Sequence, residues 1–307
     1  HDSYLGTAQK RLLEAGKRLH AAVDADLFEK DPTTYGPKAP KRVSNEKFIM
    51  AGISIASRRN HIATILDMLT SEYGPFEEPR KLLPADELVF TILSQHTSDI
   101  NSGRAYNNLM SHFGTLEHVA AASTQDIEKQ IQRGGLAKVK APRIKSVLNQ
   151  IIELNGSLDL QFLKNLPVSE GVQWLTQLKG IGPKSAGIVL NFSLGLPAMA
   201  IDTHIYRVSQ RLRIIPKSQN VDKAHVFLQK IVLPEQITNF HTAIITHGRQ
   251  TCSAQNPKCS NCVVAQLCPS KTAFLKNHSK NNSNSDKLTR NRKRIVPHSP
   301  EIPEENV

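Results

Sequence analysis

The stretch LKGIGPKSAGIVLNFSLGLPAMAIDTHIYRVSQRL, residues 178–212, decides how this chain is interpreted. Just before it, SEGVQWLTQL places Val172, Leu175 and Leu178 on one face of a helix. Lys-Gly-Ile-Gly ends that helix. PKSAGIVLNF then begins a second helix, with Pro183 at a first-turn position where its missing N–H is harmless. The stretch therefore predicts a helix, a tight turn and a second helix.

The glycines of this turn indicate a phosphate-binding site. Gly180 and Gly182 can adopt positive φ angles and leave bare backbone exposed. The N–H groups that begin the second helix would then face outward, with the positive end of the helix dipole behind them. Such a turn grips a DNA backbone without reading its bases. An ordinary helix–helix turn is the alternative, and the glycines alone do not exclude it.

Lys184 and Asp202 are the candidates for chemistry in this stretch. Lys184 lies in the first turn of the second helix, where the dipole disfavours a cation. Partial burial there would favour the neutral amine, a nucleophile that forms a Schiff base with a sugar carbon. Asp202 precedes the helix THIYRVSQRL, where it either caps that helix or places a carboxylate beside a developing positive sugar. If Thr203 caps instead, Asp202 stays free.

The composition indicates a polyanionic partner, most simply nucleic acid. The 307 residues carry 39 Lys and Arg against 27 Asp and Glu, a formal net charge of +12. A basic protein without such a partner remains the alternative on composition alone. No apolar run approaches the roughly 18 residues of a membrane span, and the charged first twenty residues lack the apolar core of a signal peptide.

Helical periodicity predicts an all-α chain. DELVFTILSQ predicts a short buried helix, Ser123 with Asp126 fits a helix start, and no segment shows the alternation of a strand. A basic amphipathic helix, AQKRLLEAGKRLHAAV, is followed by a Pro-rich charged linker. The polar tail after residue 276 is predicted to be disordered, and its KLTRNRKR either adds DNA affinity or is simply solvated. Two further helices carry apolar stripes formed by Ile62, Ile65, Leu66 and Leu69, and by Ile144, Val147, Leu148, Ile151 and Ile152.

The four cysteines predict a metal site in a reducing compartment. They form one cluster, C-x6-C-x2-C-x5-C, whereas a disulfide framework would spread along the chain. One close pair with two single outliers suits an iron–sulfur cluster, and zinc remains the alternative on spacing. The residues are Cys252, Cys259, Cys262 and Cys268.

The motifs LKGIGPKSAGIVL and AIDTHIYRV closely resemble the helix–hairpin–helix, Gly/Pro-rich loop and aspartate signature of the DNA glycosylases, and within them the endonuclease III family. The resemblance runs from about residue 58 to 272. It implies that Lys184 is the Schiff-base nucleophile and that Asp202 is essential. Adenine-specific relatives usually lack the lysine, so a bifunctional enzyme is implied. HGRQTC and the cysteine spacing likewise resemble the family's 4Fe–4S loop.

The resemblance also implies the domain organisation. We expect a six-helix barrel domain with the hairpin at 84–196 and an iron–sulfur domain formed by 56–83 together with 197–272. Lys184 and Asp202 would then come from opposite sides of a cleft. Residues 1–55 would be an extension of unknown role, and 273–307 a basic disordered tail.

Two loops match those that enter the duplex in the family. GGLAKVKA contains Leu136, which aligns with an inserted apolar wedge; a packed loop leucine is the alternative. SQHTSD contains Gln95 and His96, either of which would face the orphaned base. This loop departs from the usual family string SAQATD, which leaves the choice of lesion open.

The expected function is therefore base excision repair. A monomer would bind double-stranded DNA with a damaged base or abasic site, remove the base, most simply an oxidised pyrimidine, and cut the strand by β-elimination. Alternatives are another lesion, such as oxidised guanine or mispaired thymine or uracil, or a non-catalytic DNA-binding module. Lys184 and Asp202 argue against the last. The location would be the cytoplasmic nucleoid in a prokaryote and the nucleus or mitochondrion in a eukaryote.

Overall fold

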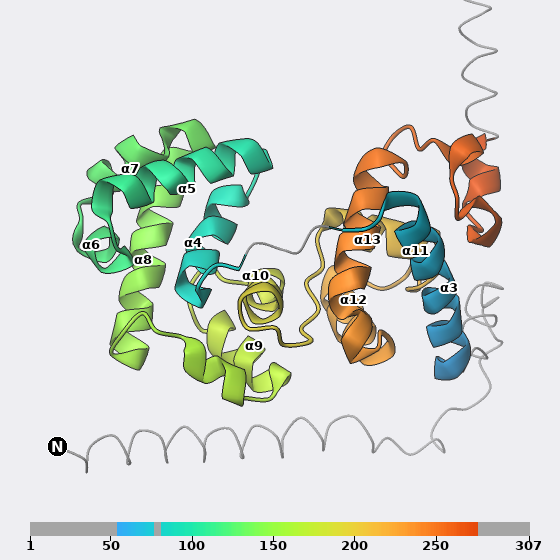
Figure 1. Cartoon of the computed structure of the whole chain (residues 1–307), viewed down its shortest axis with the longest axis horizontal. Coiled ribbons are helices and arrows are strands. Elements are labelled where there is room, and N and C mark those ends of the chain that lie inside the picture. Colours follow the sequence, from blue (N-terminus) through green and yellow to red (C-terminus); the bar gives the residue numbers. More distant parts are fainter. Residues whose placement is uncertain (1–53, 77–80, 276–307) are drawn as a thin grey trace, which may run out of the picture. The chain divides into compact units, whose positions relative to one another are not determined.

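The structure is a computed structural model that describes residues 54–76 and 81–275. Within these ranges every regular element is a helix, so the all-α prediction is confirmed (Figure 1). All of these residues belong to one compact unit, 53–307. The predicted amphipathic N-terminal helix, the Pro-rich linker and the basic segment 287–294 lie outside the described residues.

The first hydrophobic core is formed by the middle of the chain. It runs from Ala85 to Ala198 and includes Leu88, Ile144 and Leu190, all fully buried. Its helices are α4 (Pro84–Ser94), α5 (Asp99–Phe113), α6 (Leu116–Ala121), α7 (Thr124–Ile131), α8 (Ala137–Asn155), α9 (Val168–Thr176) and α10 (Pro183–Ile188). Three shorter elements complete it, namely η1 (Gln132–Gly134), η2 (Gln161–Asn165) and the π-helical turn η3 (Val189–Ser193).

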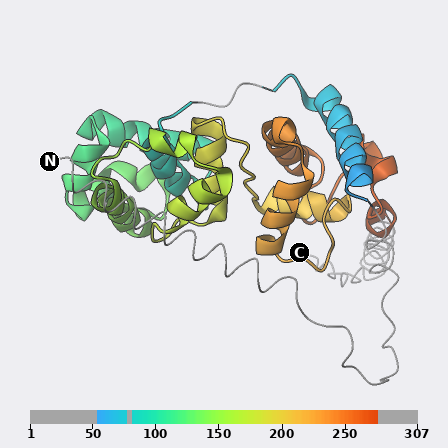
Figure 2. The same cartoon turned by 90° about the horizontal axis from the view of Figure 1, so that it is seen from below.

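The second core joins two segments that are far apart in sequence. Helix α3 (Ile55–Tyr73) packs against α12 and α13 and contributes Ile62, Ile65, Leu66 and Leu69. Both views show α3 beside the C-terminal helices of the described chain (Figures 1 and 2). The elements that follow the first core are α11 (Thr203–Arg211), α12 (Val221–Ile231), α13 (Ile237–Gln250), η4 (Pro234–Gln236), η5 (Cys259–Asn261) and η6 (Ala265–Leu267).

Local sequence signals account for most of these helices. The apolar stripe of α3 is buried as predicted, and so is that of α8 except for Ile152, which is partly exposed. Ser123 caps α7 as expected, because its hydroxyl oxygen accepts from the backbone N–H of Asp126 at 3.1 Å. The predicted short buried helix is α4.

The chain passes from one core to the other within a single peptide unit. Ala198 belongs to the first core and Met199 to the second. Gln229 fixes this crossing, accepting from the N–H of Met199 at 2.7 Å and donating to the carbonyl of Pro197 at 2.8 Å. At Gly187 of α10, a β-carbon would overlap the carbonyl oxygen of Met199. Glycine at 187 therefore lets residues 197–200, the crossing segment, lie directly against the hairpin helix α10.

Candidate functional site

The predicted hairpin is present. Helix α9 ends at Thr176, and α10 begins at Pro183. The N–H of Ile181 donates to the carbonyl of Leu178 at 2.9 Å and closes the turn. Gly180 uses the positive φ that both glycines can adopt, at +97°, whereas Gly182 has a φ of −101°. Gly182 is exposed, and its N-cap position carries no capping side chain.

Lys184 is exposed on the first turn of α10, so the partial burial that would favour its neutral amine is not found. Asp202 is half-buried and is the N-cap of α11: its Oδ1 accepts from the N–H of Ile205 at 2.7 Å. The alternative in which Thr203 caps this helix is therefore wrong. Asp202 has its structural role as a cap and still carries a carboxylate into the site.

His241 of α13 is a site residue that sequence reasoning missed. Its ring packs edge-on against Phe192 at 5.0 Å between centroids, and its Nδ1 lies 3.1 Å from the carbonyl oxygen of Ala200. A carbonyl only accepts, so Nδ1 carries the proton and Nε2 keeps its lone pair. No local motif marks this histidine, because its partners lie about forty residues upstream.

The electrostatics of His241 show that both candidate catalytic residues are near it. Burial lowers the pKa of His241 to about 4. The negative charge of Asp202 opposes this shift, whereas the positive charges of Lys184 and Arg249 add to it. The imidazole is therefore neutral at neutral pH, and the charges of Lys184 and Asp202 act on it in opposite directions.

Leu136 and His96 are exposed residues of the two loops predicted to enter DNA. Leu136 is 54% exposed with φ +54°, which excludes the alternative of a packed loop leucine. His96 is also exposed, with φ +54°. Gln95 is half-buried, and its side-chain oxygen accepts from Nη1 of Arg143 at 2.8 Å. The side chain of Gln95 is thus engaged within the protein, and that of His96 is exposed.

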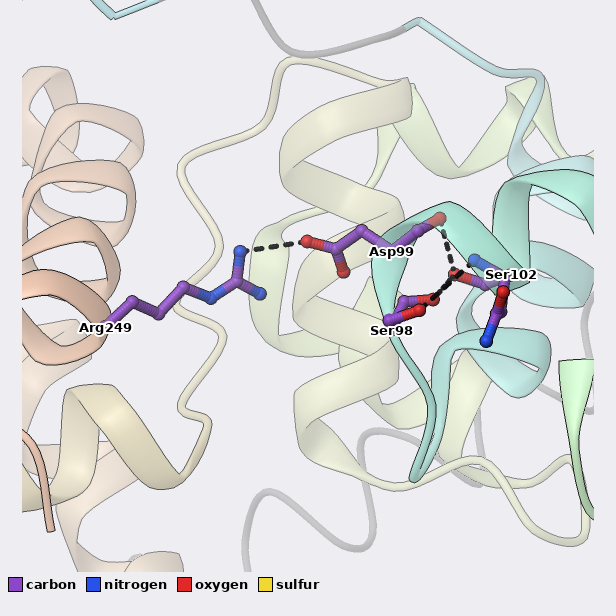
Figure 3. A network of polar contacts seen from close by, with 5 residues as sticks. Ser98, Asp99, Ser102 and Arg249 are labelled. Atoms are coloured by element: carbon purple, nitrogen blue, oxygen red, sulfur yellow. Dashed lines mark hydrogen bonds and ion pairs between the residues drawn. The ribbon is translucent and has the colours of Figure 1, made fainter.

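An ion pair joins α5 of the first core to α13 of the second core. Nη1 of Arg249 on α13 lies 2.9 Å from Oδ2 of Asp99 on the first turn of α5 (Figure 3). Ser102 donates to the carbonyls of Ser98 and Asp99 at 3.0 and 3.1 Å and so holds that turn. Both charged side chains are mainly exposed, and such a pair contributes about 0–1 kcal/mol. It therefore orients the two helices more than it stabilises them.

The four predicted metal ligands line one cavity. All four are free thiols, and burial raises the pKa of Cys262 to about 11, with the charges of the other cysteines acting in the same direction. A bound cationic cluster removes that penalty, because thiolates are its ligands. In the described part of the chain, no group of three or more His, Cys, Asp or Glu side chains could hold a single metal ion.

Arg211, at the end of α11, holds the cysteine loop. It donates to Sγ of Cys252 at 3.2 Å, to the carbonyl of Ser253 at 2.6 Å and to that of Ala254 at 2.7 Å. One helix thus carries Asp202 at its start and the contact to the cysteine loop at its end. Neither a pattern nor a spacing in the sequence pointed to this arginine.

His247 of α13 lines the same cavity, and Tyr73 of α3 contacts this histidine. Nε2 of His247 lies 3.8 Å from Sγ of Cys262, and its Nδ1 lies 3.0 Å from the hydroxyl of Tyr73. Burial lowers the pKa of His247 to about 4, so the imidazole is neutral at neutral pH. The cavity is therefore bordered by a neutral ring as well as by the guanidinium of Arg211.

Comparisons with known proteins agree with this fold and site. Residues 89–234 match the HhH-GPD superfamily of base excision DNA repair proteins, and residues 252–268 match the iron-sulfur binding domain of endonuclease III. The chain belongs to this superfamily of helix–hairpin–helix repair proteins. Within it, the chain is a member of the endonuclease III family, and the prediction of a 4Fe–4S cluster at the four cysteines is confirmed.

The relatives include endonuclease III of Thermotoga maritima, 32% identical over 196 residues that cover 64% of this chain and 82% of that protein. Endonuclease III of Escherichia coli K12 is 31% identical over 185 residues, 60% of this chain and 83% of that protein. A protein of Arabidopsis thaliana is 35% identical over 177 residues, and the chain spans 58% of that protein's length.

Solved structures show the same fold. The structure of a trapped endonuclease III–DNA covalent intermediate has a TM-score of 0.61 and 27% identity, covering 71% of this chain and 98% of that one. A thermostable thymine-DNA glycosylase has a TM-score of 0.59 at 19% identity and shares the fold alone. No helix in the described ranges is long and apolar enough to cross a membrane.

Proposed function

We propose that this chain is a bifunctional DNA glycosylase and abasic-site lyase that removes an oxidised pyrimidine and cuts the strand. The observation that carries the proposal is the placement of Lys184, exposed on the first turn of α10, and Asp202, at the N-cap of α11, whose charges both act on His241. The crossing segment packs against Gly187 of α10 and leads directly into α11. An amine and a carboxylate converging on one site supply a nucleophile and a stabiliser for a positively charged sugar.

The target base has to leave the helical stack before either residue can reach its sugar. The amine of Lys184 then attacks C1′, and the bond from C1′ to the base breaks. The carboxylate of Asp202 stabilises the electron-poor sugar and accepts a proton from the amine. The bond from C1′ to the ring oxygen O4′ then breaks, O4′ takes up a proton, and a Schiff base between Lys184 and C1′ results. The Schiff base acidifies C2′, and loss of that proton expels the 3′ phosphate. Because His241 is neutral, it adds no positive charge to this step.

We assign different parts of the chain to holding the DNA. Leu136 fills the space that the flipped nucleotide leaves, and His96 faces the orphaned base; their exposure supports both roles. The N–H groups at the start of α10, next to Gly182, bind a backbone phosphate. The partner is double-stranded DNA with a damaged base or an abasic site, and the enzyme acts as a monomer.

The remaining parts of the chain support this cleft. Residues 84–196 form the barrel domain, and 56–83 with 197–272 form the iron–sulfur domain; the two separate cores support this division. The cluster supplies a cross-link that holds the loop 252–268 in place, and the reaction does not pass through it. Location follows the DNA, in the nucleoid of a prokaryote or in the nucleus or mitochondrion of a eukaryote.

A panel of lesion duplexes tests the proposed function. The chain is incubated with duplexes that carry an oxidised pyrimidine, oxidised guanine, mispaired thymine or uracil, or an abasic site, with and without borohydride. We expect a covalent protein–DNA adduct and strand cleavage, with the oxidised pyrimidine as the best base substrate. Preference for another lesion would change the substrate and keep the mechanism, whereas binding without excision or trapping on every duplex would contradict the proposal.

A further inference from the structure

Lys140 is a buried lysine without a carboxylate partner among the described residues. Its side chain is 3% exposed, and its Nζ donates to two backbone carbonyls, that of Leu93 at 2.7 Å and that of Gly134 at 2.8 Å. Burial lowers its pKa. Burying an ammonium group is costly, and an apolar side chain would fill this core position at less cost. The position of the two carbonyls indicates what the lysine does.

Each carbonyl lies just before one of the two loops assigned to DNA. Leu93 is in the last turn of α4, three residues before His96, and Gly134 ends η1, two residues before Leu136. An ammonium group also suits the negative end of a helix. His96 and Leu136 both have a φ of +54°. Residues other than glycine rarely adopt this left-handed backbone conformation unless the surrounding structure restrains them. One ammonium group therefore connects the two backbone segments that lead into these strained loops.

Arg143 extends the same arrangement to the hairpin. It lies one turn after Lys140 on α8 and donates to the side chain of Gln95 at 2.8 Å. Its Nε packs over Gly180, where a β-carbon would approach to 3.3 Å. Helix α8 itself begins directly after Leu136. The first two turns of this helix thus contact all three segments that the proposed function places on DNA.

We propose that Lys140 is a positioning residue, which fixes the separation between His96 and Leu136 so that both enter the duplex together, with Arg143 joining this pair of loops to the hairpin. This rests on the proposed function. Lys140 does not touch DNA in this account, because its ammonium group is buried and used by two carbonyls. Without Lys140, each loop would still form, but the separation between His96 and Leu136 would no longer be fixed.

The test compares Lys140→Met with Lys145→Met in the full-length, cluster-loaded protein. Lys145 is a matched control, because it lies on the same helix and its ammonium also donates to a backbone carbonyl, that of Ala122 at 2.5 Å, after α6. Arg143→Gln is a second variant, in case Lys140→Met does not fold. Two quantities are measured: single-turnover base excision, and the fluorescence of 2-aminopurine opposite a stable abasic analogue, which reports insertion into the stack.

For Lys140→Met we expect excision to fall by about tenfold or more and the fluorescence change on binding to be largely lost, with affinity for undamaged duplex within about twofold of wild type. Arg143→Gln should show the same pattern, more weakly, and Lys145→Met should match wild type. Wild-type excision and fluorescence in both Lys140→Met and Arg143→Gln would overturn the proposal, as would an equal loss in Lys145→Met. The fluorescence does not depend on catalysis, so it decides the positioning role even if the wild-type chain excises no base.

Discussion

Asp202 accepts a hydrogen bond from the backbone N–H of Ile205 at 2.7 Å, so the carboxylate assigned to catalysis is also the cap of α11. Helix α11 leads from the cleft to the cysteine loop through Arg211. The cap therefore fixes the carboxylate at the point where the crossing segment meets α11. The two roles predict separable effects of substitution.

Asp202→Asn should lose excision and keep the fold. Asparagine caps a helix about as well as aspartate, so the free energy of unfolding should change by under about 0.5 kcal/mol. Loss of the charge opposite the sugar should cost roughly 3 kcal/mol of transition-state stabilisation, a fall of more than about 100-fold in excision. Cleavage at a preformed abasic site should fall less. Asp202→Ala should add a stability loss of about 1 kcal/mol. Unchanged excision in Asp202→Asn would leave Asp202 as a cap only.

Two glycines of the hairpin region should respond differently to alanine. A β-carbon at Gly182 meets nothing within 4 Å, so Gly182→Ala should fold normally and bind DNA more weakly, because the methyl group stands where a phosphate would approach. Gly187→Ala should destabilise the protein by roughly 1–3 kcal/mol, since its β-carbon would overlap the carbonyl of Met199. Thermal unfolding and binding to a labelled duplex measure both. Equal stability of the two variants would refute the close packing at 187.

Arg211→Met should make the cluster easier to lose. The substitution removes four donated hydrogen bonds to the cysteine loop, including those to the sulfur and the carbonyl of Cys252. We expect the visible absorption of the cluster to decay several-fold faster in urea than in wild type. Lys217→Met, which replaces an exposed cation of the same charge, is the control. Identical decay in all three proteins would show that Arg211 does not hold the loop.

The half-buried, neutral His241 of α13 predicts a pH dependence of stability. The pKa of His241 falls from 6.5 to about 4 on folding, so the unfolded chain binds the proton more tightly. Stability is then fully present above pH 6.5 and decreases as the pH falls toward 4, by at most roughly 3 kcal/mol. His241→Asn should flatten this slope, and substitution of the exposed His112 should not. Hydrogen exchange of α13 between pH 7 and 4.5 measures it. An unchanged slope in His241→Asn would refute the assignment.

Local patterns in the sequence predicted the elements and the principal site residues. Apolar spacing located α3 and α8, Pro183 marked the start of α10, and the cysteine spacing located the metal loop. These signals work because helix periodicity, first-turn proline and ligand spacing are properties of neighbouring residues.

Other site residues depend on contacts between distant segments. Lys140 reaches a carbonyl 47 residues upstream, and His241 one 41 residues upstream, which no local pattern encodes. The sequence left the conformation of Gly182 and the exposure of Lys184 open for a related reason. A glycine permits a positive φ without requiring it, and exposure is set by the surrounding fold.

Borohydride trapping of the Lys184→Gln variant tests the central claim most directly. Lys184 is exposed, so its substitution should leave the fold and the backbone N–H groups of the hairpin unchanged. On a duplex with an abasic site, wild type should form a covalent adduct and cut the strand. Lys184→Gln should form no adduct and make no cut while binding the duplex with near wild-type affinity. A Lys184→Gln protein that traps at wild-type yield would contradict the account, because the Schiff base would then form on another amine.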